Sequence, residues 1–73
     1  MTIEEAKQLI DGELYLFKHD DKIMKRLFRN IESTRNNFSG YTQFYLKLST
    51  YEPTPINSGY VIEHIELIGV YKV

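Results

Sequence analysis

Residues 20–31 read DDKIMKRLFRNI, and the predicted fold depends mainly on this stretch. Its apolar residues recur at i, i+1, i+4, i+5 and i+8, the spacing of one buried face of an α-helix. They are Ile23, Met24, Leu27, Phe28 and Ile31. Asp20 and Asp21 suit the cap and first turn of a helix, where carboxylates meet unpaired N–H groups. The pattern predicts an amphipathic helix that ends in the turn-forming residues 36–40.

The predicted helix would present a basic face opposite its apolar stripe. Four cations would lie on it: Lys22, Lys25, Arg26 and Arg29. Such an array can follow a phosphate backbone or an acidic protein surface, or it can simply be a solvated face. The charge is segregated along the chain, since residues 1–21 sum to −4, residues 22–50 to +5 and residues 51–73 to −2. A basic surface can therefore exist although the total charge is only −1.

The segments before this stretch predict a short helix and a strand. Thr2 and Glu5 have the spacing of a capping box, in which each side chain accepts a hydrogen bond from the other residue's backbone. Apolar residues follow at helical spacing, and Gly12 provides a stop, so a helix is expected over residues 3–10. Residues 13–18 are apolar and aromatic between charged ends, which is typical of a strand.

The segments after it change to a period of two. Between residues 41 and 51, Phe44, Leu46 and Leu48 alternate with polar residues and tyrosine, which predicts a strand with one buried face. Residues 52–59 contain two prolines and predict a loop. Residues 60–73 predict a long final strand with a bulge between residues 66 and 69, and a helix over residues 60–68 is the alternative.

These elements predict one α+β domain over residues 1–73, in the order α-β-α-β-β. Both helices would pack on one face of a three-stranded, mainly antiparallel sheet that ends in a C-terminal hairpin. The chain has no cysteine, so it can form neither a disulfide nor a thiolate zinc site. No apolar run approaches the ~20 residues that span a bilayer, and the acidic start does not resemble a secretory signal. A cytoplasmic protein without membrane contact is expected, as a monomer or a homodimer.

Residues that could support catalysis or metal binding show no recognisable pattern. Ser39 and Ser58 each precede a glycine but lack the surrounding motif of a nucleophilic serine. The four glycines are dispersed, which argues against a phosphate-binding loop. His19, Asp20 and Asp21 are consecutive, and a helix cap explains them better than a metal site, while His64 fits a strand position. We predict no catalytic residue, metal or cofactor, and hence no enzyme.

Outward-facing tyrosines are the second candidate binding feature. Tyr41, Tyr45 and Tyr51 share a parity that points away from the core, with Lys47 among them. Such a row can anchor a protein interface or stack bases, or simply suit a half-exposed sheet. The predicted partner-binding residues are Lys22, Lys25, Arg26, Arg29, Tyr41, Tyr45, Lys47 and Tyr51.

The function predicted from these features is binding of a larger protein. The chain would be a small accessory or inhibitory protein, and its size suggests a phage or another mobile element as the source. It would dock through the tyrosine-bearing sheet face, the basic helix face, or both. The alternative is a nucleic-acid-binding accessory factor that uses the basic face of the second helix.

Overall fold

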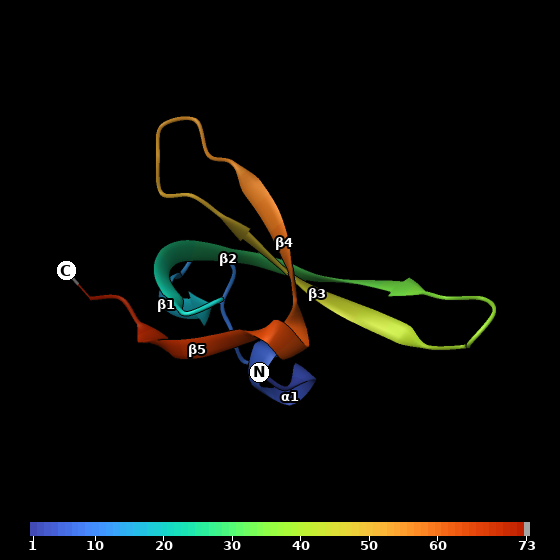
Figure 1. Ribbon diagram of the computed structural model, residues 1–73. Coiled ribbons are helices and arrows are strands. Elements are labelled where there is room, and N and C mark those ends of the chain that lie inside the picture. Colours follow the sequence, from blue (N-terminus) through green and yellow to red (C-terminus); the bar gives the residue numbers. More distant parts are fainter. Residues whose placement is uncertain (73) are drawn as a thin grey trace.

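The protein is built around one five-stranded antiparallel sheet, as the computed structural model of residues 1–72 shows (Figure 1). The strands are β1 (Leu14–His19), β2 (Lys22–Arg35), β3 (Thr42–Ser49), β4 (Asn57–Val61) and β5 (Ile65–Val70). Their order across the sheet is β4-β3-β2-β1-β5. The helical elements are α1 (Ile3–Ala6) and a single 3₁₀ turn, η1 (Ile62–His64).

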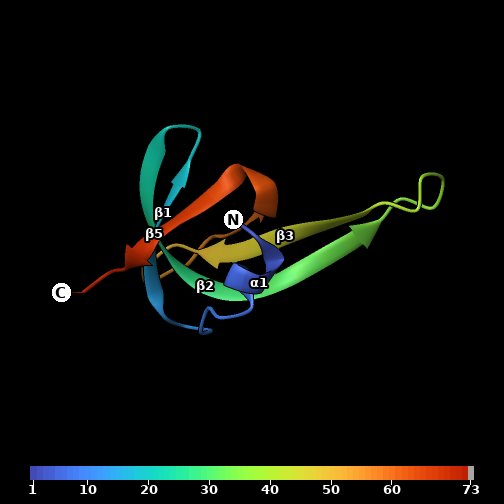
Figure 2. The same cartoon turned by 90° about the horizontal axis from the view of Figure 1, so that it is seen from below.

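The sheet is strongly bent, and its connectivity explains why. β4 and β5 lie at opposite edges of the sheet, yet only the three residues of η1 separate them in the chain. A flat sheet would hold its two edges far apart, because neighbouring strands are about 4.8 Å apart. The sheet must therefore curl until its edges approach each other, and Figures 1 and 2 show it curled around α1 and η1.

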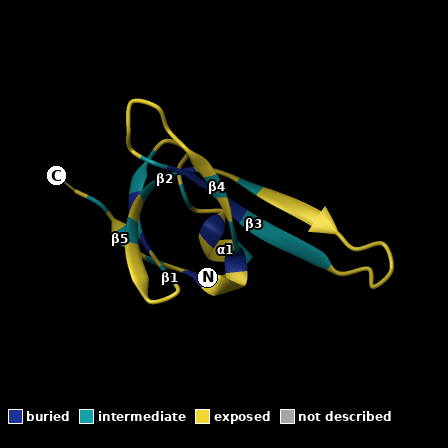
Figure 3. Cartoon of the chain, turned by 45° about the horizontal axis from the view of Figure 1, so that its top comes forward, coloured by how far each residue is buried: buried dark blue, intermediate teal, exposed yellow. Residues whose placement is uncertain are grey.

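The inner face of the bent sheet forms the core. Phe17 on β1 and Leu46 and Leu48 on β3 are fully buried there, and Phe28 of β2 faces Leu48. Ala6 of α1 and Ile62 of η1 belong to the same cluster, so the two helical elements fill the concave side (Figure 3). The expected strand is confirmed over Thr42–Ser49, where Leu46 and Leu48 are buried while Tyr45 and Lys47 are only half-buried, although Ser49 at its end is buried too.

The capping box that begins α1 is confirmed, but the helix is shorter than expected. The Thr2 backbone N–H donates to the Glu5 carboxylate at 3.0 Å, and the Glu5 N–H donates to the Thr2 hydroxyl at 3.2 Å. The hydrogen bond from the Thr2 backbone lowers the pKa of Glu5. The helix ends at Ala6 instead of residue 10, because the Gln8 and Leu9 N–H groups donate to carbonyls three residues earlier, in a turn tighter than an α-helix. The Ile10 N–H then donates to the Tyr15 hydroxyl at 2.9 Å.

The predicted helix over residues 20–35 is wrong, because residues 22–35 form the long strand β2. Met24 and Phe28 lie on the inner face, while Ile23 and Leu27 lie on the outer face. The register shift between Phe28 and Asn30 then moves Ile31 onto the inner face, three residues after Phe28. A strand with apolar residues on both faces and a bulge thus reproduces helical spacing. The predicted two helices on a three-stranded sheet are replaced by five strands and one short helix.

Asp20 and Asp21 form a tight hairpin turn and cap no helix. Both have positive φ, 50° and 62°, and they join β1 to β2 so that His19 pairs with Lys22. Two positive φ values are the signature of the type I′ turn, which suits the twist of a hairpin. Such backbone conformations are unfavourable for residues other than glycine, with aspartate and asparagine the most tolerant.

The effect of a substitution at Asp21 on stability should therefore depend on how easily the new residue adopts positive φ. Asp21→Gly is expected to raise the free energy of unfolding by about 0.5 kcal/mol, because glycine accepts positive φ without strain. Asp21→Val is expected to lower it by about 1–2 kcal/mol, since a β-branched residue does not. Urea unfolding followed by circular dichroism measures the free energy of unfolding of both variants. A valine variant as stable as the glycine variant would contradict the type I′ turn.

The remaining elements differ from the prediction mainly in where they begin and end. Residues 14–19 form the expected strand, and the loop after β3 ends at residue 56, so that β4 begins at Asn57 instead of residue 60. β3 and β4 form a hairpin, but η1 interrupts the predicted final strand, whose residue 73 lies outside the described residues. The alternative helix over residues 60–68 is reduced to that single turn. The expected bulge is confirmed, because Leu16 pairs with Gly69 while Phe17 pairs with Leu67, leaving Ile68 unopposed.

One part of the sheet projects from the body as an arm. It comprises residues 30–35 of β2, the turn of residues 36–41 and residues 42–44 of β3 (Figures 1 and 2). The arm makes the molecule elongated, with extents of 45 × 24 × 23 Å. Hydrogen bonds order its tip, where the Asn36 side chain accepts from the backbone N–H groups of Phe38 and Ser39 at 2.9 and 3.3 Å. Phe38 is fully exposed there.

Candidate partner-binding surface

The four predicted cations of the second helix do not share a face. In β2, Lys25 lies on the outer face of the sheet, while Arg26 pairs with the buried Tyr15 and belongs to the inner side. The Arg26 guanidinium donates to the Lys25 carbonyl at 2.8 Å. Lys22 lies at the turn end of the strand and shares the parity of Arg26. The basic helix face is therefore absent, and strand alternation divides its residues between two sides.

The outer side of β2 instead carries a shorter row that combines charge and apolar surface. Lys25 and Leu27 alternate along it, and Arg29 follows at the bulge. The Lys25 ammonium lies 4.6 Å from the ring centre of Tyr71, close enough for a cation–π interaction. The Arg29 guanidinium lies 3.6 Å from the Asp11 carboxylate, and both side chains remain about half exposed or more. Both cations are thus oriented by neighbours but still accessible.

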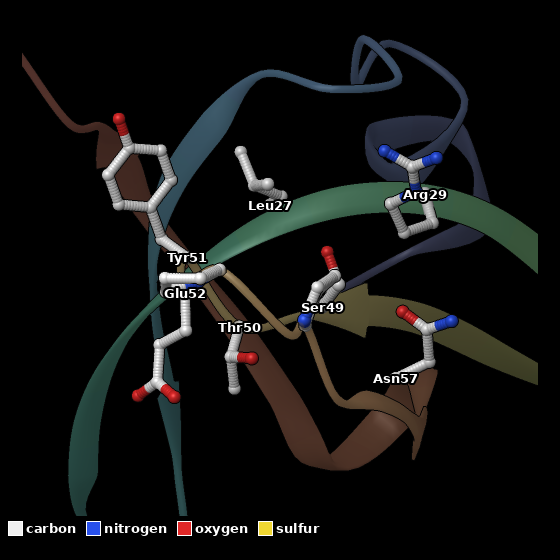
Figure 4. Close-up of a pocket in the computed structure, with 9 residues that line it drawn as sticks. Leu27, Arg29, Ser49, Thr50, Tyr51, Glu52 and Asn57 are labelled. Carbon is white, nitrogen blue, oxygen red and sulfur yellow. The ribbon is translucent and has the colours of Figure 1, made fainter.

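A pocket of about 460 Å³ opens beside this row, under the loop that joins β3 to β4. Leu27 and Arg29 contribute from β2, and Tyr51 contributes from the loop. Figure 4 shows Leu27 between the Tyr51 ring and the Arg29 guanidinium. The other lining residues are Ser49, Thr50, Glu52, Pro53, Pro55 and Asn57.

Two features give this pocket defined walls. The Ile56 N–H donates to the Thr50 hydroxyl at 2.8 Å, and the Thr50 N–H donates to the Ile56 carbonyl at 3.0 Å, so the loop is closed at its base. Pro53 and Pro55 each fix one backbone dihedral within that loop. We call Lys25, Leu27, Arg29, Tyr51 and Tyr71 the pocket face. It joins an apolar floor, two aromatic rings and two cations.

The predicted tyrosine row is not a single surface, because only Tyr45 lies on β3, while Tyr41 precedes the strand and Tyr51 belongs to the loop that follows it. Tyr45 and Lys47 lie on the outer face, opposite Glu32 and Asn30 of β2. The Tyr41 hydroxyl donates to the Glu63 carboxylate at 2.8 Å, and this hydrogen bond raises the pKa of Tyr41. Tyr41 therefore tethers the arm to η1. Tyr51 lies six residues beyond Tyr45, about 20 Å along an extended chain, so the tyrosines do not form one surface.

Sequence reasoning named Lys25, Arg29 and Tyr51 among the candidate binding residues but missed what surrounds them. Leu27 was assigned to a buried stripe, and Tyr71 was not considered. The usable signal was the alternation of Lys25, Leu27 and Arg29, which suits the outer face of a strand once the helix is abandoned. Pro53 and Pro55, which line the pocket, predicted only a loop.

A second, polar pocket lies between the β1–β2 turn and η1. Its volume is about 760 Å³, and it is lined by Glu5, Asp20, Asp21, Glu63 and Glu66 together with Met1, Lys18, His64, Ile65 and Leu67. Within residues 1–72, no group of three histidine or acidic side chains is arranged to hold a metal ion. The pocket is open and acidic, and it contains none of the predicted binding residues.

Comparisons with known proteins leave the site to be judged by its own chemistry. No protein-family model, no curated protein and no solved structure matches the chain. Within residues 1–72, neither helical element has the length and apolar character needed to cross a bilayer.

Proposed function

We propose that the chain is a non-catalytic protein-binding module, accessory or inhibitory in role, that docks through its pocket face. The observation that carries the proposal is the open pocket in which Leu27, Tyr51 and two prolines meet beside Arg29. Tyrosine and arginine are among the residues enriched at the energetic centres of protein interfaces. A loop closed at its base and stiffened by proline also loses little entropy on binding.

The chemistry of the pocket face indicates the kind of segment it takes. The apolar floor at Leu27 would receive one aromatic or aliphatic side chain, and the Tyr51 ring would cover it. Lys25 and Arg29 flank this position and favour an acidic residue next to that side chain. The expected partner segment is therefore a loop or extended peptide with an apolar anchor beside aspartate or glutamate.

A random peptide library displayed on phage tests this proposal with a defined probe. Selection on the wild-type chain is expected to enrich peptides with an aromatic or aliphatic residue next to an acid. Tyr51→Ala should weaken their binding at least about tenfold, as expected for an anchoring aromatic residue. Tyr45→Ala is the matched control, since Tyr45 lies on the outer face away from the pocket. Enriched peptides that bind the Tyr51→Ala variant as tightly as wild type would contradict the proposed face.

Nucleic acid is the second candidate ligand for the same face. It is favoured by one observation, the placement of Lys25 over the Tyr71 ring, with Arg29 and Tyr51 nearby, which resembles a base-stacking platform beside phosphate contacts. Fluorescence anisotropy with labelled single-stranded and duplex DNA and RNA distinguishes a nucleic-acid ligand from a protein ligand. Binding that weakens steeply with salt and disappears in the Lys25→Glu, Arg29→Glu double variant would favour nucleic acid. No binding at low salt would leave the protein partner.

A further inference from the structure

The pocket under the β3–β4 loop extends across the sheet as far as its β4 edge. Leu27, Ser49 and Asn57 lie side by side on β2, β3 and β4, since Leu27 pairs with Ser49 and Ser49 pairs with Asn57. All three line the pocket (Figure 4). A further strand beside β4 would lie about 4.8 Å away, so its residue opposite Asn57 would stand at the rim of the pocket.

The backbone of β4 has hydrogen-bonding groups that face away from β3. The Thr50 N–H donates to the Ile56 carbonyl at 3.0 Å, which makes these residues a hydrogen-bonded pair. Bonded and non-bonded pairs alternate along an antiparallel ladder, so Ser58 and Tyr60 are the next residues of β4 that bond to β3. Within residues 1–72, no strand pairs with the other side of β4. The N–H and C=O groups that point outward there belong to Asn57, Gly59 and Val61.

Charge distinguishes this edge from the other strand edges that have no partner. β4 reads NSGYV and contains no charged residue. In contrast, β5 contains Glu66, and the part of β2 in the arm contains Glu32 and Arg35. Charged side chains and prolines commonly keep an edge strand from pairing with another chain. The edge of β4 has neither, and it is the edge that adjoins the pocket.

A cation lies across the middle of the β4 edge. Gly59 has no side chain, and Lys47, its partner on β3, lies over this position. A methyl carbon on Gly59 would be 3.3 Å from the Lys47 Cδ and 3.6 Å from the Lys47 Nζ. Among the described residues, Lys47 forms no salt bridge. Its ammonium is therefore available to an acidic side chain on a strand that lies beside β4.

We propose, building on the proposed function, that the partner segment bound at the pocket continues along β4 as an added antiparallel strand. Main-chain hydrogen bonds give such an added strand its affinity, and its alternate side chains give specificity. The side chain opposite Asn57 is the apolar anchor, and the one opposite Gly59 is an acid that meets Lys47. In the antiparallel direction the acid comes first. The ligand pattern is therefore aspartate or glutamate, any residue, and then the anchor.

Amide hydrogen exchange measured by NMR tests the added strand directly. The probe is the tightest-binding peptide from the phage library, added to saturation. The amides of Asn57, Gly59 and Val61 are expected to exchange at least about tenfold more slowly in the complex. Ser58 and Tyr60 are internal controls, because their N–H groups bond to β3 with or without the peptide. Unchanged exchange at the three outward amides would overturn the proposal.

A charge exchange at Lys47 tests the position of the acid. Lys47→Glu should weaken binding of a peptide of the expected pattern at least about tenfold, and lysine in place of the peptide's acid should restore binding. Lys7→Glu is the matched control, because it makes the same charge change at an exposed position that follows α1. Lys47 is only half-buried, so the variant is expected to fold, and an unchanged circular dichroism spectrum checks this. Equal binding by the Lys47→Glu and Lys7→Glu variants would exclude the acid opposite Gly59.

Failure of the added strand can be told apart from failure of the proposed function. Selected peptides that lose affinity with Tyr51→Ala, but leave the outward amides of β4 unprotected, would keep the pocket face and overturn the added strand. A library that yields no peptide sensitive to Tyr51→Ala would contradict the pocket face and the added strand together. Tyr51 lies in the loop, outside β4, so its replacement leaves the backbone edge itself intact.

Discussion

Replacing Phe17 by alanine is expected to lower the free energy of unfolding by about 3–5 kcal/mol. Phe17 has no exposed surface and lies between Met24 of β2 and Leu67 of β5, with the Tyr15 ring 5.9 Å away. Its removal would leave a cavity at the centre of the sheet that the surrounding strands cannot close. Because a domain of this size is stable by only about 5–10 kcal/mol, the variant should unfold at a much lower urea concentration than wild type.

Urea unfolding monitored by circular dichroism measures this effect. Ile23→Ala is the control, since Ile23 is mostly exposed on the outer face and its loss should change stability by less than about 0.5 kcal/mol. Equal effects at the two positions would mean that the concave side of the sheet is not the core.

The second large effect is expected from proline at position 18. Lys18 lies on β1 between Ile23 of β2 and Glu66 of β5, so its backbone belongs to a strand paired on both sides. Proline there removes an N–H from the ladder and should lower the free energy of unfolding by about 3 kcal/mol. Lys18→Ala is the matched control, because the side chain is exposed and contributes little. Thermal unfolding of both variants compares them, and a proline variant as stable as the alanine variant would exclude a central β1.

The sequence predicts the strands whose apolar residues alternate on one face. β3 is the clearest, since Leu46 and Leu48 face the core and Tyr45 and Lys47 do not. The sequence does not predict β2 as a strand, because its outer face is also apolar at Ile23 and Leu27. The bulge at Arg29 also shifts the alternation of inward and outward residues by one position. Helix propensity of the Lys, Met, Arg and Leu residues reinforced the mistake, and tertiary pairing overrode it. The contrary signals were Asn30, Ser33 and Thr34, which are poor helix formers.

The candidate site could be predicted only in part, for the same reason. Lys25, Arg29 and Tyr51 were chosen for their chemistry, but a helical wheel placed the two cations beside Arg26 and opposite Leu27. In a strand, Lys25 and Leu27 share the outer face, and the loop of Pro53 and Pro55 comes over it. Long-range pairing decides these neighbours, and no local pattern contains it. The arm could not be read from the sequence either, since it depends on where β1 ends relative to β2.

The joining of β1 to β5 has a consequence for how the chain folds. The first strand of the sheet is completed on one side by residues 65–70, more than forty positions later in the chain. Contacts at such separations are slow to form, because a large loop must close before any of them is made. During synthesis, the hairpin of β1 and β2 can form early, but one side of β1 stays unpaired until residue 70 has left the ribosome. In that interval the nascent chain exposes the unpaired edge of β1, which makes it prone to aggregation.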